Sequence, residues 1–165
     1  MPSEYTLSPL LPRHIDRMEE LEKLCFSVPW SRAALEDELT NPCARYVVCE
    51  RDGAVVGYSY FTVWPERASA EIAGAMRADI QGAGGGGEGA VRSFSWMFDA
   101  LKVRLIGLTA APDNVRSIKL IDRAGFVRMG ERESVRPDGT IRRSLYWEMT
   151  RDGWAQLQAG MADRT

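Results

Sequence analysis

The chain has 165 residues, of which 45% are hydrophobic and 27% charged, with a formal net charge of −2 at pH 7. This composition is ordinary for a soluble one-domain protein and excludes the strongly basic surface typical of nucleic-acid binders. No segment approaches the roughly 20 apolar residues of a membrane helix, and the N-terminus lacks a signal-peptide pattern. We therefore expect one domain over residues 1–165, with neither a nucleic acid nor a membrane as partner.

Cysteine and histidine are scarce. Cys25, Cys43 and Cys49 are odd in number and lack CxxC spacing, which indicates neither a zinc site nor a disulfide framework and favours a cytoplasmic location. His14, the single histidine, stands near the start of a predicted helix, where a surface or capping role is favoured over chemistry. We expect no metal, and no Ser–His–Asp triad.

Hydrophobic periodicity and breaker residues predict the elements in chain order. Strands are expected at residues 5–10, 45–50, 54–64, 68–76, 102–110, 126–135 and 140–149. Helices are expected from residue 15 up to Pro29 and at 32–39, 91–101 and 112–123, with a frayed helical tail after about residue 154. The order is β-α-α-β-β-β-α-β-α-β-β, without an internal repeat or a domain linker.

Turn and cap residues sharpen several of these boundaries. Asp52-Gly53 and Pro137-Asp138-Gly139 each predict a hairpin between two strands. Ser31 is a plausible N-cap, and Gly125 is well placed to end a helix. Gly74, in the middle of a predicted strand, indicates a bulge or a close approach by another backbone or a ligand.

A glycine-rich stretch, residues 81–87, lies between the strand 68–76 and the helix 91–101. A glycine turn that opens a helix presents unpaired N–H groups at the positive end of the helix dipole, which suits a phosphate. A flexible linker is the alternative, although the position at a strand-to-helix junction disfavours it. The stretch also fits GxGxxG, but it lies mid-chain after antiparallel strands and lacks the Lys of a Walker A loop, so NAD and nucleoside triphosphates are disfavoured.

With this loop at its centre, the element order resembles the GCN5-related N-acetyltransferase (GNAT) superfamily. Residues 26–31 and 44–57 look like the first half of the ribosomal-protein N-terminal acetyltransferase RimI, and residues 81–86 match the family's pyrophosphate loop. Residues 114–126 match its Asn-led helix ending in Gly-Phe, and the closing hairpin fits both RimI and the RimJ/RimL branch. The resemblance implies a single α/β (α+β) domain with a mixed, mostly antiparallel sheet of about six or seven strands, flanked by helices.

The resemblance also implies acetyl-CoA as the acyl donor. In such enzymes the strand before the loop splays from its neighbour and pairs with the pantetheine arm, the loop amides hold the pyrophosphate, and the Asn binds the cofactor arm. The cofactor-binding residues implied are Gly74, Ala75, Met76, Gln81, Gly82, Ala83, Gly84, Gly85, Gly86 and Asn114. Asn114 is also a good helix N-cap, and the two roles are compatible.

The catalytic groups depart from the RimI pattern. Ile121 stands where the family's acid tyrosine is expected, and Thr109 stands where RimI has its glutamate base. Ser117 fits the Asn-x-x-Ser spacing of the RimJ/RimL branch, whose serine lies near the thiolate. Tyr146 is a candidate acid. The candidate bases, acting directly or through water, are Glu71, Glu131 and Glu133.

We accordingly predict an N-acetyltransferase that moves an acetyl group to a primary amine by direct attack in a ternary complex. The acceptor is either a protein or peptide N-terminus or a small amine, and a homodimer is compatible with the family. The alternative is a GNAT-fold module that binds acyl-CoA with little or no turnover, which Ile121, Thr109 and the long glycine run favour.

Overall fold

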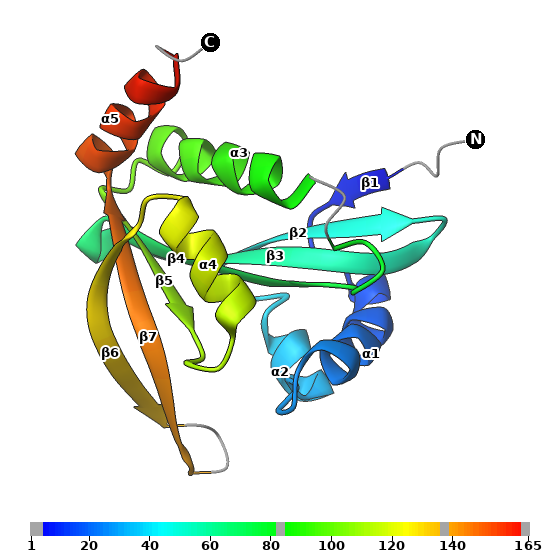
Figure 1. The fold of residues 1–165 in the computed structure, drawn as a ribbon. Coiled ribbons are helices and arrows are strands. Elements are labelled where there is room, and N and C mark those ends of the chain that lie inside the picture. The colour runs from blue at the N-terminus through cyan, green and yellow to red at the C-terminus, as the bar shows by residue number, and fades with distance from the viewer. Residues whose placement is uncertain (1–4, 82–84, 136–138, 163–165) are drawn as a thin grey trace. The chain divides into compact units, whose positions relative to one another are not determined.

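The computed structural model describes residues 5–81, 85–135 and 139–162 (Figure 1). They form a sheet with the strand order β1-β2-β3-β4-β5-β7-β6. The chain divides into two compact units, residues 1–64 with 72–93 and residues 65–71 with 94–165. Strand β4 (Ser69–Met76) contributes its first three residues to the second unit and the rest to the first.

In the first unit, helices and strands alternate much as the sequence predicts. The elements are β1 (Tyr5–Ser8), the short 3-10 helix η1 (Pro12–His14), α1 (Ile15–Cys25), α2 (Arg32–Asp37), β2 (Ala44–Arg51) and β3 (Ala54–Trp64). The Ser31 side chain accepts a hydrogen bond from the Ala34 N–H, which confirms the predicted cap of α2. Asp52 and Gly53 have φ of 53° and 77°, as a tight hairpin turn between β2 and β3 requires.

The core of the first unit lies between α1 and the β2–β3 hairpin. Strand β2 alternates buried and exposed residues, so that Tyr46 and Val48 face the same side. The apolar stripe of α1, with Ile15, Met18 and Leu21 almost fully buried, packs on that side. Figure 1 shows α1 and α2 on the same side of the hairpin.

His14 is buried, with 1% of its surface exposed, which corrects the prediction of a surface role. Its Nδ1 accepts a hydrogen bond from the Leu11 N–H, and it stands at the N-cap position of α1. That bond caps the short helix η1, whose N-cap residue is Leu11, whereas the His14 side chain makes no capping bond to α1.

The second unit is built around a long hairpin of β6 (Val127–Val135) and β7 (Ile141–Thr150), curved in Figure 1. Strand β7 pairs with β6 along one edge and with β5 (Leu105–Ala110) along the other. The helices are the second half of α3 (Gly85–Asp99), α4 (Val115–Arg123) and α5 (Arg151–Ala162). Trp147, with 0% of its surface exposed, and the Phe94–Trp154 edge contact at 5.7 Å belong to its core.

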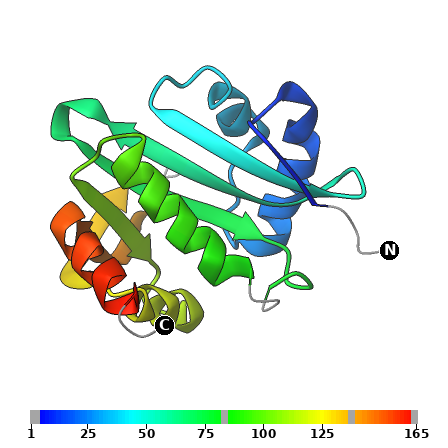
Figure 2. The ribbon, with the colours of Figure 1, turned by 90° about the horizontal axis from the view of Figure 1, so that it is seen from above.

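Several element boundaries differ from the prediction: β1 ends at Ser8, α2 ends at Asp37, α4 begins at Val115, and the tail predicted to be frayed is the helix α5, which begins at Arg151. Helix α3 begins at Gly85 instead of Val91 and is one unbroken helix (Figure 2). Each helical glycine costs about 1 kcal/mol relative to alanine, but the buried face with Phe94 and Phe98 stabilises a nucleus from which the helix extends backwards. Strand β5 begins at Leu105, because Lys102 has φ of 56° and interrupts extended backbone.

Most of the strand pairing described is antiparallel. The pairs β1–β2, β2–β3, β5–β7 and β6–β7 are antiparallel, whereas β4 and β5 are parallel. This confirms the predicted fold class, an α/β domain with a mixed, mostly antiparallel sheet. A search of the described residues finds no helix with the length and apolar character needed to cross a membrane.

Candidate active site

Strand β4 comes unusually close to β3. A Cβ on Gly74 would lie 2.4 Å from the carbonyl oxygen of Tyr58, and one on Gly57 would lie 3.0 Å from the carbonyl oxygen of Ala75. Only glycine fits such an approach, so the predicted close contact at Gly74 is confirmed, and the approaching group is backbone. The pairing of β4 with β5 covers Ser69–Glu71 and Leu105–Gly107.

The end of β4 is tied to the start of the glycine-rich stretch. The Gln81 side-chain amide donates to the Met76 carbonyl oxygen at 2.6 Å, and the Cys25 sulfur lies 3.8 Å from the same oxygen. The Gln81 N–H donates to the Arg77 carbonyl at 3.3 Å. A carbonyl has two lone pairs, and the Gln81 amide and the Cys25 thiol both donate to this one.

Of the predicted loop residues, Gly82, Ala83 and Gly84 lie outside the described part of the chain. Gly85 and Gly86 open α3 instead of belonging to a loop before it. The first four N–H groups of an α-helix have no intrahelical acceptor, and the helix dipole makes this end positive. The amides of Gly85 and Gly86 are thus donors of the kind that binds phosphate.

Asn114 and Ser117 mark the start of α4 in the second unit. The Asn114 side-chain oxygen accepts a hydrogen bond from the Ser117 N–H at 3.1 Å, so the capping role of Asn114 is confirmed. The Asn114 side chain is exposed and Ser117 is half-buried. Neither residue's capping geometry prevents the Asn114 amide nitrogen from donating to a ligand.

Glu71 and Tyr146 meet across Gly107. A Cβ on Gly107 would lie 3.1 Å from the Tyr146 ring and hydroxyl and 3.4 Å from the Glu71 Cγ. The three residues come from β4, β7 and β5, so the parallel and antiparallel neighbours of β5 bring together side chains far apart in sequence. The absence of a side chain at residue 107 leaves room for both.

Burial shapes the chemistry of this pair. Burial raises the pKa of the Glu71 carboxyl above its ordinary value, and the nearby Arg132 guanidinium only partly opposes that shift. Burial, together with a 2.8 Å hydrogen bond to Glu148, raises the pKa of Tyr146 to about 12. At neutral pH Tyr146 therefore keeps its proton, and the Glu71 carboxylate binds a proton more readily than an exposed glutamate does.

Arg132 and Glu148 complete this cluster. The Arg132 guanidinium carbon lies 3.3 Å from the Tyr146 ring centroid, and its Nη1 lies 3.8 Å from Oε1 of Glu71. Sequence reasoning identified neither residue. The alternation of Tyr146 and Glu148 along one strand was the available signal for Glu148, whereas Arg132 depends on the β6–β7 register, which the sequence does not state.

The structure does not bring the other candidates to this cluster. Glu131 and Glu133 oppose Leu145 and Arg143 on β7, so they project from the face opposite Tyr146. Glu133 pairs with Arg143 at 2.9 Å. Ser117 belongs to α4, which lies on the Trp147 face of β7, because the Trp147 indole donates to Asp122 of that helix at 2.8 Å.

A protein-family comparison matches residues 7–127 to the family described as the acetyltransferase (GNAT) domain. The match covers well over half of the chain.

The chain belongs to the GNAT acetyltransferase family. It is an acetyl-CoA-dependent acetyltransferase.

Solved structures show the same fold at low sequence identity. A predicted acetyltransferase from T. thermophilus is 21% identical with a TM-score of 0.76, and the alignment covers 99% of this chain and 95% of that one. The spermidine/spermine N-acetyltransferase SpeG from Vibrio cholerae is 18% identical with a TM-score of 0.75, with 93% and 98% covered. None of the curated protein sequences compared with this chain matches it.

In this GNAT protein the structure shows what surrounds Ile121 and Thr109, the two positions that depart from the RimI pattern. Ile121 is 9% exposed, so it is part of the apolar face of α4 and offers no proton donor. Thr109 pairs directly with Tyr146 across the β5–β7 ladder. A tyrosine thus adjoins the position where RimI carries its base, although it comes from the neighbouring strand.

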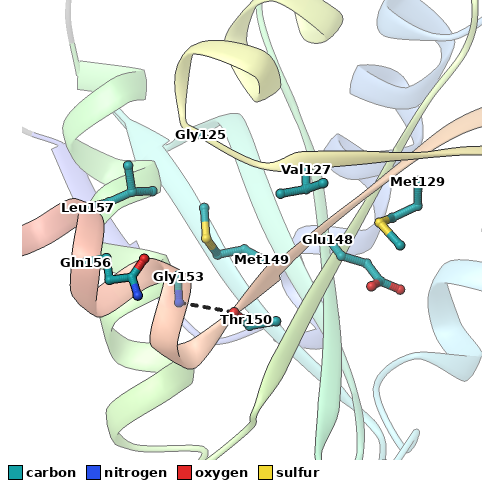
Figure 3. Close-up of a pocket in the computed structure, with 9 residues that line it drawn as sticks. All are labelled: Gly125, Val127, Met129, Glu148, Met149, Thr150, Gly153, Gln156 and Leu157. Carbon is teal, nitrogen blue, oxygen red and sulfur yellow. Dashed lines mark hydrogen bonds between the residues drawn. The ribbon is translucent and has the colours of Figure 1, made fainter.

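The acetyltransferase also has a pocket of about 520 Å³ in the second unit (Figure 3). Its lining comes from the start of β6, the end of β7 and α5: Gly125, Val127, Met129, Glu148, Met149, Thr150, Gly153, Gln156 and Leu157. None of the residues predicted for catalysis or cofactor binding lines it. Within the described ranges, no group of three His, Cys, Asp or Glu side chains suits a metal ion.

Proposed function

We propose that this acetyltransferase moves the acetyl group of acetyl-CoA directly to a primary amine, with Glu71 as general base and Tyr146 as general acid. The meeting of Glu71 and Tyr146 over Gly107 is the observation that carries the proposal. A half-buried carboxylate beside a protonated phenol has the two proton-transfer groups that aminolysis of a thioester requires. Ser117 is the second candidate acid for the thiolate.

Atoms and charges balance in the proposed step. The acceptor binds as an ammonium ion, and Glu71 takes one of its protons. The amine lone pair attacks the thioester carbonyl, a C–N bond forms and the C–S bond breaks. The CoA thiolate takes the proton of Tyr146, and the phenolate recovers a proton from the new amide nitrogen. Glu71 then releases its proton to water.

For the cofactor, we assign backbone groups of Gly74, Ala75 and Met76 to the pantetheine arm. Among the described residues β4 pairs with β5 over Ser69–Glu71, which supports this assignment because the strand continues beyond that pairing to Met76. The amides of residues 81–86 are assigned to the pyrophosphate. The amide of Asn114 is assigned to the cofactor arm, beside its role as N-cap.

Asn114→Ser tests the last assignment with little disturbance of the helix. Serine caps a helix about as well as asparagine, so the melting temperature is expected to change little. Loss of the amide donor is expected to raise the KM for acetyl-CoA about threefold to tenfold, the value of one hydrogen bond. Calorimetry of acetyl-CoA binding checks the same point; an unchanged Kd contradicts the cofactor role of Asn114.

Two classes of acceptor are considered, a protein or peptide N-terminus and a small amine. The RimI-like segments at residues 26–31 and 44–57 favour a protein or peptide N-terminus, whereas the likeness to SpeG adds spermidine and spermine to the small amines worth testing. A thiol-release assay with N-terminal peptides, polyamines and monoamines separates them. We further propose one domain over residues 1–165, a cytoplasmic location, which the three free cysteines suit, and a homodimer as the assembly to test.

The alternative function is an acyl-CoA-binding module with little turnover, and the buried Ile121 favours it because the family's acid is missing there. The same assay decides between the two. Acetyl-CoA binding without thiol release on any amine supports the module, and no acetyl-CoA binding contradicts both.

A further inference from the structure

Arg132 lies where a cation meets both an aromatic face and a carboxylate. Its guanidinium carbon is 3.3 Å from the Tyr146 ring centroid, and its Nη1 is 3.8 Å from Glu71 Oε1. Its side chain is 53% exposed, and it extends from the edge strand β6, in which every residue is exposed. An aromatic face beside a carboxylate is the arrangement by which proteins bind ammonium and guanidinium groups.

The contact is looser than the hydrogen-bonded arginine–carboxylate pairs at Arg143 and Arg13. Arg143 donates to Glu133 at 2.9 Å and Arg13 donates twice to Glu50, at 2.6 and 2.9 Å. The Arg132–Glu71 separation of 3.8 Å is too long for a hydrogen bond. Exposed ion pairs of this kind contribute about 0–1 kcal/mol, so a ligand can displace Arg132 at low cost.

The charges that remain without Arg132 select the ligand. Glu71 on β4 lies across Gly107 from Tyr146, and Glu148 on β7 accepts a hydrogen bond from the Tyr146 hydroxyl, which stays protonated at neutral pH. Gly107 and Thr109 of β5 add no charge. Further along the same face of β7, Ser144 is neutral and the exposed Arg142 is the next positive charge. Two carboxylates beside an aromatic ring favour a cation and disfavour an acceptor with a carboxylate next to its amine.

We propose that Arg132 occupies the binding place of the acceptor's ammonium group in the free protein, and that the acceptor is a primary alkylammonium without a neighbouring carboxylate, which displaces it. This inference rests on the proposed function and deepens it. Once the guanidinium has moved away, the ammonium of the acceptor lies between Tyr146 and Glu71, next to the carboxylate that takes its proton.

Arg132→Gln tests the displacement. Without the internal competitor, the KM for cationic amines is expected to fall about threefold to tenfold, in line with a weak cation–π contact and a weak ion pair. The acidic limb of the kcat/KM profile is expected to move to higher pH, because loss of the guanidinium raises the pKa of Glu71 further. A raised KM means that Arg132 binds the substrate, and an unchanged KM means a merely exposed arginine; both overturn the proposal.

Arg143→Gln is the matched control. Arg143 is an exposed arginine of the same hairpin, but it pairs with Glu133 on the other face, so its loss is expected to change neither KM nor the pH profile.

Methylguanidinium separates this inference from the proposed function, because its binding needs no turnover. In calorimetry it is expected to bind Arg132→Gln more tightly than the unchanged protein. If no amine is acetylated but methylguanidinium binds Arg132→Gln more tightly, the proposed cation site is supported and the proposed reaction is wrong. If amines are acetylated and methylguanidinium binds both proteins equally, the displacement is wrong.

Discussion

Glu50 in the first unit is buried and Glu71 in the second is half-buried, each beside an arginine, yet their pKa values are shifted in opposite directions. Arg13 donates to both oxygens of Glu50, which lowers the pKa of that carboxyl in spite of its burial. Arg132 reaches Glu71 only at 3.8 Å, so burial prevails and the pKa rises. Two short charge-assisted hydrogen bonds outweigh desolvation, and one long contact does not.

The comparison separates a structural carboxylate from a chemical one. Each oxygen of Glu50 accepts a hydrogen bond from Arg13, and His14 Nε2 lies 3.5 Å from its second oxygen. Glu71 has an ion-pair contact and an adjacent tyrosine, and no described residue donates a hydrogen bond to its carboxylate. Perturbed groups that retain hydrogen-bonding capacity are the better candidates for proton transfer.

The largest effect is expected from Glu71→Gln. Removal of the base is expected to lower kcat about 10²- to 10⁴-fold with an unchanged KM for acetyl-CoA, because a glutamine accepts no proton. Steady-state kinetics with the best amine of the panel measures it. Glu50→Gln, the control, is expected to keep kcat at temperatures where it stays folded. Retention of a third of the activity in Glu71→Gln would sink the assignment.

Tyr146→Phe is expected to have a smaller effect, about tenfold in kcat. The CoA thiolate is a good leaving group, so the acid is needed less than the base. Tyr46→Phe makes a matched control, since Tyr46 also donates to a glutamate, Glu38 at 2.9 Å, but in the first unit. Equal losses in both variants would point to a folding effect and contradict the acid role.

The pH dependence of the rate follows from the raised pKa of Glu71. The base must be ionised, so kcat/KM is expected to fall as the pH drops through a value above the ordinary pKa of glutamate. The limb is expected to vanish in Glu71→Gln and to persist in Glu50→Gln. A limb common to both variants would assign the titration to another group.

The contributions of Glu50 and Glu71 to the free energy of unfolding are expected to change with pH in opposite directions. Glu50 has a lowered folded pKa, so its contribution is full above the unfolded pKa and is lost as the pH falls through the folded value. Arg13→Gln is therefore expected to lower the melting temperature at pH 7 and to match the unchanged protein in acid. Arg17→Gln, which removes an exposed pair with Glu20, is the control.

The smallest effect is expected on the melting temperature when Glu71 is replaced. Its folded pKa is raised, so the native state binds more protons and the stability falls as the pH rises through the shifted range. Glu71→Gln is expected to melt slightly above the unchanged protein at pH 8, with the difference vanishing below the ordinary pKa of glutamate. A lower melting temperature at pH 8 would show that Glu71 is structural, like Glu50.

Local signals in the sequence predicted much of what is observed. Asp52-Gly53, Ser31, Asn114 and Gly125 act through their own backbone and nearest neighbours, and each is a turn or cap in the structure. Glu71 and Tyr146 were predicted as candidates from their residue types. Their catalytic roles stay predictions, as do the roles of Ser117 and the glycine-rich stretch.

The sequence by itself determined the order of elements, the GNAT resemblance and the residue types available for chemistry, because periodicity, turn residues and motif spacing are local properties of a chain. Only the tertiary structure decided which carboxylates meet which partners. The β4–β5 and β5–β7 pairings bring Glu71 and Tyr146 together over Gly107, and the β6–β7 register places Arg132 between them and solvent. Register depends on contacts between distant segments, and a shift of one residue would turn Arg132 to the other face.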